Sequence, residues 1–170
     1  LTITPGEAAR RLPRIGVVPS FSADFSDVLL HTIVKRDLEL SGEVELLSDR
    51  AAPPGVDASD TTVDLDEWAA KGVEAVVKVA ASTAGDRASL HGHVYLVKGK
   101  RTGPVLQRKA TVDAAEVRKE AHRLADLVIG ALTGQNGGFA SRMTFVSGIR
   151  AVRRAYVIDS DGHDPHPISP

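Results

Sequence analysis

The clearest pattern of apolar and polar positions lies in residues 113–142. Apolar residues recur there at helical spacing, namely Val117, Ala121, Leu124, Val128 and Leu132. Asp113 and Glu116 have the spacing of a capping box, and Gly134 is placed to end the helix in a left-handed conformation. The pattern therefore predicts an amphipathic helix over residues 114–132.

The charged residues of this helix fall on its other faces, and the pattern assigns them to water. They are Glu116, Lys119, Glu120, Arg123 and Asp126. His122 is flanked by Arg118, Lys119 and Asp126, so we expect it on the same exposed face.

A second helix is predicted over residues 23–41. One stripe of this helix is apolar, with Leu30, Ile33, Val34 and Leu38, and Gly42 follows as its stop. Further along, Asp64 or Asp66 is placed to cap a short helix that contains Trp68. We expect the indole of Trp68 to pack partly against a sheet.

Short runs rich in β-branched residues lie between turn signals and predict strands. These runs are residues 14–19, 43–47, 75–81, 88–97 and 105–112. The last two are separated by a loop with two glycines, which is typical of a hairpin. We therefore expect an α/β (α+β) fold, in which a mixed sheet of about five strands packs against two main helices.

Beyond the long helix the pattern changes to a glycine-rich bend at Gly137 and Gly138 and two extended runs, residues 143–147 and 155–159. A basic linker joins these runs through Arg150, Arg153 and Arg154. Two strands alone do not build a stable core in water. The tail is thus expected to be the first fragment of a larger module.

The composition of the sequence limits the classes of protein to which the chain can belong. Of the 170 residues, 42% are hydrophobic and 25% charged, as in an ordinary globular core. The net charge of -1 provides no general field for nucleic acid or anionic lipid. The sequence has no cysteine, which excludes thiolate metal sites, disulfides and a cysteine nucleophile. No apolar run approaches the roughly 20 residues of a membrane span, and the start at Leu1 is compatible with a removed signal peptide or with a fragment boundary.

Three groups of residues suggest chemistry, and each has a simpler interpretation. His91 and His93 share a strand face at a spacing that can bind zinc, but no third ligand is evident, so a solvated face shared with Tyr95 is favoured. The run at residues 159–164, DSDGHD, lacks the glycine position and closing glutamate of a calcium loop, so a hairpin turn is favoured.

The third group is a basic hairpin tip, which consists of Lys98, Lys100, Arg101, Arg108 and Lys109. It has the charge to contact phosphates but lacks the aromatic residues that stack on bases. The sequence contains no serine nucleophile elbow, Walker loop or dinucleotide fingerprint. No catalytic residue, metal site or cofactor is therefore predicted.

Four sequence motifs occur in an order that identifies a family. They are RIGVVPSF at residues 14–21, RDLELSGEVELL at 36–47, WAAKGVEAVVKVA at 68–80 and LTGQNGGFASRMTFV at 132–146. Together they resemble the N-terminal domain of TolB, a family of periplasmic proteins of the Tol-Pal system. The closing run AYVIDSDGHDP at residues 155–165 is similar to the opening blade of the β-propeller that follows in this family.

The resemblance implies a non-enzymatic adaptor that supports outer-membrane integrity, cell division and protein import. It implies three parts: an arm at residues 1–13, an α/β domain at 14–138, and a linker with the first propeller strands at 139–170. The arm would bind the C-terminal domain of TolA, and the propeller, mostly outside this sequence, would bind the lipoprotein Pal. The residues implied for the arm contact are Leu1, Thr2, Ile3 and Thr4, and those implied between the domains are Leu132, Gly134, Gly138 and Phe139.

The alternation of Leu1 and Ile3 suits the addition of a strand to the edge of a partner's sheet. A different class of function stays open from the residues alone. A stand-alone α/β domain of anticodon-binding-like architecture would bind nucleic acid or an anionic ligand through its sheet. The sequence also leaves open whether the exposed hairpin pairs two copies of the chain into a dimer.

Overall fold

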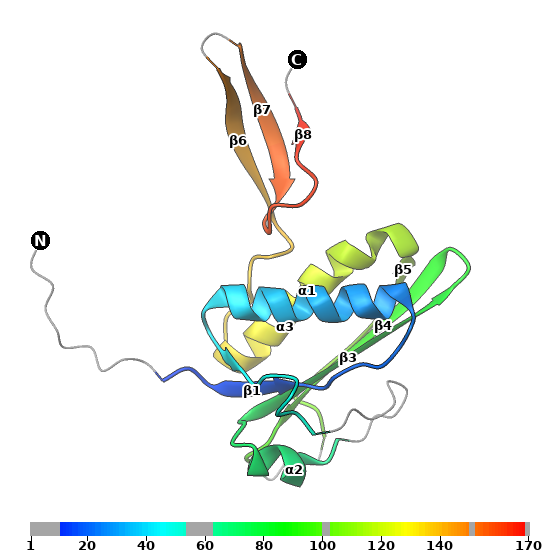
Figure 1. Cartoon of the computed structure of the whole chain (residues 1–170), viewed down its shortest axis with the longest axis vertical. Helices are drawn as coiled ribbons and strands as arrows, with labels where there is room; N and C mark the ends of the chain where they lie inside the picture. Colours follow the sequence, from blue (N-terminus) through cyan, green and yellow to red (C-terminus); the bar gives the residue numbers. More distant parts are fainter. Residues whose placement is uncertain (1–10, 54–62, 100–102, 150–151, 169–170) are drawn as a thin grey trace, which may run out of the picture.

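A five-stranded mixed sheet forms the body of the molecule (Figure 1). The computed structural model describes residues 11–53, 63–99, 103–149 and 152–168. The strands of this sheet are β1 (Arg14–Val17), β2 (Glu45–Leu46), β3 (Ala75–Ala84), β4 (Arg87–Leu96) and β5 (Leu106–Asp113). They lie in the order β2-β1-β3-β4-β5, in which β1 runs parallel to β2 and β3, and the remaining pairs are antiparallel.

Two long helices, α1 (Phe25–Ser41) and α3 (Val117–Thr133), cover one face of this sheet (Figure 1). The main core lies between them and includes Ile15, Leu30, Leu38, Val77, Leu90, Val94, Leu124 and Val128. At its centre Leu124 lies directly on the backbone of Gly92, where a Cβ atom would collide with the leucine side chain. The predicted α/β fold with about five strands and two main helices is confirmed.

The opposite face of the sheet carries the short helix α2 (Leu65–Ala70) and a smaller core around Trp68. The indole is buried and lies against Gly16 of β1, where a Cβ atom would fall inside van der Waals contact with the ring. The other buried residues of this cluster are Val18, Leu47, Val73, Val76 and Tyr95. The expected packing of Trp68 on the sheet is thus confirmed, and Asp64 caps α2 through the backbone N–H groups of its first turn.

The helix ends follow the predicted stops but not the predicted capping box. Gly42 and Gly134 end α1 and α3 with φ of 65° and 85°, a conformation that glycine adopts without steric cost. Asp113 makes no side-chain cap, however, because its carboxylate accepts a hydrogen bond from Arg87 at 2.6 Å. A 3-10 turn, η1 (Ala114–Glu116), precedes α3 instead.

The start of α1 is tied to the end of β3 by Asp24. Its carboxylate accepts hydrogen bonds from the N–H of Ser26, which is the helix cap, and from the N–H of Thr83 at 2.6 Å. The hydrogen bond from Thr83 is the largest cause that lowers the pKa of Asp24 below its ordinary value. One carboxylate therefore stabilises the helix terminus and fixes it to the sheet.

We expect Asp24→Ala to reduce the free energy of unfolding by about 1 to 2 kcal/mol near neutral pH, because the helix loses its cap. Since the pKa of Asp24 is lower in the folded state, this stabilisation is present above the unfolded pKa of about 4 and is lost as pH falls through the folded value. Urea denaturation of the wild type and of the variant at about pH 7 and about pH 3 measures the loss of stability and its dependence on pH. An equal difference at the two pH values would contradict the ionic cap.

The hairpin β3–β4 turns on only two residues, Gly85 and Asp86, and then pairs over ten residues of each strand. Gly85 has φ of 64°, which the tight turn requires. β3 is therefore longer than the sequence predicts, because it extends through Thr83 and Ala84 to the turn itself, whereas β4 has the predicted length and lies one residue earlier than predicted.

A second sheet stands away from the first, on the other side of α1 and α3 (Figure 1). It contains β6 (Arg142–Ile149), β7 (Val152–Asp159) and β8 (His166–Pro167), all antiparallel. Two strands were expected here, and β8 is an addition. The predicted basic linker is wrong for Arg153 and Arg154, which lie within β7, whereas Arg150 lies outside the described residues.

Candidate functional site: the junction between the two sheets

The predicted interdomain residues lie at the end of α3 and in the linker to β6. Leu132 and Phe139 are partly buried and pack against the main core. Gly134 is the left-handed end of α3, and Gly138 follows in the linker. The predicted partner-binding residues of the arm, Leu1, Thr2, Ile3 and Thr4, lie outside the described residues.

The linker is held against α3 by Asp126, which sequence reasoning assigned to water. Its carboxylate accepts hydrogen bonds from the N–H groups of Phe139 at 2.7 Å and Ala140 at 2.9 Å. Its backbone carbonyl accepts a third, from Gly137 at 3.1 Å. A Cβ atom on Gly137 would collide with the Asp126 side chain, which explains a glycine at this position. The first part of the linker is therefore attached to the middle of α3.

The prediction that His122 faces water is wrong. This histidine is only 2% exposed, and its Nδ1 lies 2.6 Å from the carboxylate of Asp37 on α1, which is fully buried. The contact joins the polar sides of the two long helices. Helical periodicity could not reveal it, because the flanking residues Arg118 and Asp126 are also polar and also face the junction.

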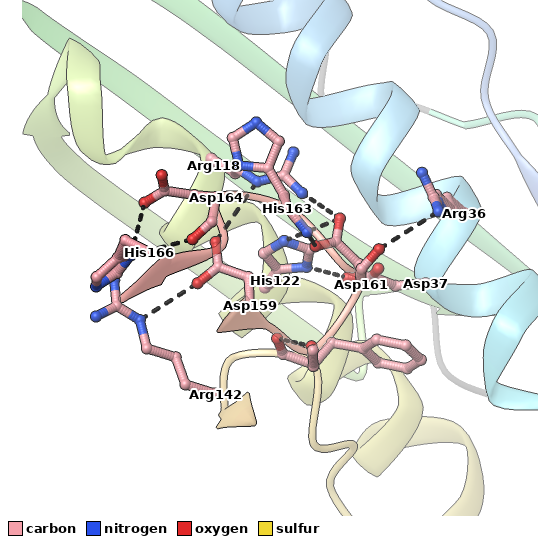
Figure 2. A network of polar contacts seen from close by, with 12 residues as sticks. Arg36, Asp37, Arg118, His122, Arg142, Asp159, Asp161, His163, Asp164 and His166 are labelled. Atoms are coloured by element: carbon pink, nitrogen blue, oxygen red, sulfur yellow. Dashed lines mark hydrogen bonds and ion pairs between the residues drawn. The ribbon is translucent and has the colours of Figure 1, made fainter. Parts of the chain in front are cut away.

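The turn between β7 and β8 closes this junction from the other side (Figure 2). Asp161, whose side chain is 3% exposed, accepts a hydrogen bond from the Arg118 guanidinium and lies 3.8 Å from Nε2 of His122. Its backbone carbonyl accepts from Arg36 of α1 at 3.5 Å. Groups from both helices thus converge on one residue of the second sheet.

The pKa values of the two carboxyl groups beside His122 are shifted in opposite directions. Burial raises the pKa of Asp37 above its ordinary value, and the hydrogen bond from His122 offsets this only in part. Burial acts in the same direction on Asp161, but hydrogen bonds from Arg118 and from the N–H of His163 outweigh it and lower the pKa of Asp161. Asp161 is therefore the ionised partner of Arg118 at neutral pH.

A cleft of about 480 Å³ opens beside these residues, between α3 and the second sheet. It is lined by side chains of both signs, including Arg118, Lys119, Arg142, Asp159, His163 and Asp164. Arg142 and Asp159 form an ion pair at 3.3 Å along its wall. The junction is thus a polar interface with room next to it.

The other residues for which the sequence suggested chemistry are a turn and two histidines of β4. The turn predicted for residues 159–164 is confirmed, with Gly162 at φ of 87°. The solvated face expected for His93 and Tyr95 is wrong: both are buried, and their rings stack at 6.2 Å. Burial lowers the pKa of His91 and of His93. Within the described ranges no group of three acidic, histidine or cysteine side chains is arranged to hold a metal.

The basic hairpin tip does not form one cluster among the described residues. Arg108 lies in β5, where its guanidinium binds the buried carboxylate of Glu120 at 2.7 Å. Lys100 and Arg101 lie outside the described residues. Glu120 was expected to face water; it is buried instead, and this ion pair compensates for the burial of its charge. The arrangement gives no support to a phosphate-binding tip.

No helix in the described part of the chain is long and apolar enough to cross a membrane.

Comparisons with known proteins point to one family. The family described as TolB amino-terminal domain matches residues 1–101. The Tol-Pal system protein TolB of Methylococcus capsulatus is 33% identical over 159 residues, which are 91% of this chain and 37% of that protein. That of Syntrophotalea carbinolica is 32% identical over 138 residues, or 78% and 31% of the two chains.

The crystal structure of TolB from Acinetobacter baumannii is similar in fold, with a TM-score of 0.77 and 26% identity, over 94% of this chain and 39% of that one. This chain spans about a third of the length of the curated relatives it matches. The motif order, the mixed sheet with two long helices and these matches agree, and the chain belongs to the TolB amino-terminal domain family, whose curated relatives are named Tol-Pal system proteins.

Proposed function

We propose that this chain is the N-terminal part of a non-enzymatic adaptor of the Tol-Pal system that works in the periplasm. The family match over residues 1–101 carries this proposal, and the structural similarity to a solved TolB over 94% of the chain supports it. The adaptor would hold other envelope proteins together and so support outer-membrane integrity, cell division and protein import. It would need no cofactor.

The proposed division of labour follows the three parts of the chain. Residues 1–13 form the arm that binds the C-terminal domain of TolA, through the strand-like alternation of Leu1 and Ile3. Residues 14–138 form the domain that carries the arm. Residues 139–170 form the linker and the first strands of a β-propeller, which binds Pal.

Two observations on the described residues are consistent with this division. The second sheet exposes large apolar side chains, namely Met143, Phe145, Val146 and Ile168, as expected of a surface that further strands would cover. The chain before β1 has an exposed ion pair, between Arg11 and Glu74 at 3.4 Å. An arm attached there is able to reach a partner without disturbing the core.

The proposed arm is tested by deletion. Removing residues 1–10 should abolish binding to the TolA C-terminal domain and leave the fold intact. This deletion stops short of Pro13, because the carbonyl of Pro13 accepts a hydrogen bond from Glu45 and belongs to the sheet. Isothermal titration calorimetry measures the binding, and the thermal unfolding midpoint reports the fold. An unchanged affinity in the deleted protein would rule out the arm.

A matched pair of double variants tests how the arm binds. In an added strand alternate side chains point to opposite faces, so Leu1→Ala with Ile3→Ala should weaken binding much more than Thr2→Ala with Thr4→Ala. Equal losses from the two pairs would argue against strand addition while leaving the deletion result, and hence the adaptor role, as a separate question.

A further inference from the structure

We infer that Asp161 is a releasable latch, which holds the three-stranded sheet in one orientation against α1 and α3, and that residues 139–141 are the pivot on which this sheet swings when the latch opens. The inference concerns how the two sheets are coupled and does not depend on the proposed partners. It rests on the contacts of Asp161 that Figure 2 shows and on the hydrogen bonds by which Asp126 holds the linker.

The pivot is held in place by hydrogen bonds to its backbone from both sides. The carboxylate of Asp126 holds the N–H groups of Phe139 and Ala140. On the side of the second sheet, the hydroxyl of Ser160 donates to the carbonyl of Phe139 at 2.6 Å, and the N–H of Ser160 donates to the carbonyl of Ser141 at 3.3 Å. The base of the second sheet therefore stays attached to the C-terminal half of α3 whatever happens at the latch.

The latch is a second point of attachment, and it consists of contacts between charged side chains. In the described part of the chain, the ion pairs and the hydrogen bonds that tie the end of β7 and the β7–β8 turn to the helices come from two residues, Asp159 and Asp161. The Arg118 guanidinium makes the central contact, as it donates a hydrogen bond to Asp161 and lies 3.8 Å from Asp159. An ion pair between a guanidinium and a carboxylate is strongly directional. The contact therefore restrains the orientation of the turn relative to α3.

The same geometry makes the closed state easy to open. Three polar atoms of the junction are buried without a hydrogen-bond partner, namely Oδ1 of Asp37, Nε2 of His122 and Nε of Arg118. A buried polar atom that lacks a partner destabilises the state that buries it. The cleft of about 480 Å³ is lined by Arg118 and His122, so it gives the turn room to move and would let water reach these two side chains. The closed junction is therefore held by Asp161 against a cost that opening relieves.

The test measures the orientation of the two sheets directly. The sequence has no cysteine, so Glu67→Cys on α2 and Ser147→Cys on β6, both exposed, give a uniquely labelled pair for spin labels. Pulsed electron paramagnetic resonance on the full chain should give one narrow distance distribution. Asp161→Asn removes the charge and keeps the shape, and the distribution should become broad. Arg118→Gln removes the other partner of the same contact, on α3, and should broaden the distance distribution equally.

The matched control is Asp164→Asn, in the same turn. Asp164 is exposed and has φ of 53°, which asparagine tolerates, so this variant removes one negative charge without touching the latch. Its distance distribution should stay narrow. In parallel, hydrogen exchange at the N–H of Asp159 and of Gly162 should accelerate by about 10- to 100-fold in Asp161→Asn, as the loss of one hydrogen bond to a charged group implies.

Narrow distributions in both Asp161→Asn and Arg118→Gln would overturn the latch. A broadening in Asp164→Asn as large as that in Asp161→Asn would overturn it too, because any loss of charge in the turn would then suffice. Far-UV circular dichroism separates unfolding from release. If the broadening comes with a loss of helical signal, the helices have changed and the latch is again contradicted.

Discussion

Replacing Trp68 with alanine should lower the free energy of unfolding by about 3 to 5 kcal/mol, the cost of removing a large aromatic side chain from a core. The indole is 3% exposed and lies on the backbone of Gly16. The cavity cannot close easily, because β1 is held between β2 and β3 and cannot move toward α2. Chemical denaturation followed by circular dichroism measures the loss.

A second aromatic side chain provides the control for this prediction. Phe21 is 81% exposed, and Phe21→Ala should change the free energy of unfolding by no more than about 0.5 kcal/mol. If the two variants were equally stable, Trp68 would not anchor α2 to the sheet, and the smaller core would contribute little to the fold.

Asp27→Ala should destabilise the protein by about 3 kcal/mol or more, since it leaves the buried N–H of Ala81 and the partly buried hydroxyl of Ser20 without their acceptor. The fully buried carboxylate accepts a hydrogen bond from the N–H of Ala81 at 2.6 Å and another from the hydroxyl of Ser20. It thereby joins the first turn of α1 to the middle of the sheet. His31 lies 4.0 Å away, and burial, which outweighs the attraction of Asp27, lowers the pKa of His31.

The matched control removes an aspartate from an exposed pair. Asp49 binds Lys35 at 2.6 Å, but its side chain is 58% exposed, so Asp49→Ala should cost less than about 1 kcal/mol. Both variants are compared by urea denaturation at neutral pH. A loss at Asp27 no larger than that at Asp49 would mean that the donors of Ala81 and Ser20 find other partners, which would contradict the role given to this carboxylate.

Much of the α/β body could be predicted from local rules in the sequence. Gly42 and Gly134 mark the ends of the two long helices because few other residues adopt a left-handed conformation cheaply. The apolar stripes of both helices lie in the core as predicted. These features depend on neighbours in the chain, which is why pattern and propensity reach them.

The junction could not be predicted in the same way. A polar helix face is exposed only where no other part of the protein covers it. Here His122 and Arg118 on the polar side of α3 are covered by Asp37 of α1 and by Asp161 of the second sheet. The failed capping box has a similar cause. Arg87, distant in the sequence, takes the carboxylate of Asp113 that the cap would need. Contacts between distant charged residues leave no periodic signal.

The pairing of β1 has a consequence for the growing chain. β3 and β4 are joined through two residues and can zip together as soon as both exist, with little loss of loop entropy. β1 instead pairs with β3 across α1, β2 and α2, so Ile15 and Val17, both buried in the finished sheet, have no partner strand on that side until β3 has been synthesised. During that interval the backbone groups of the first strand that face β3 have no partner in the sheet, and the strand completes its place only after later parts of the polypeptide have been made.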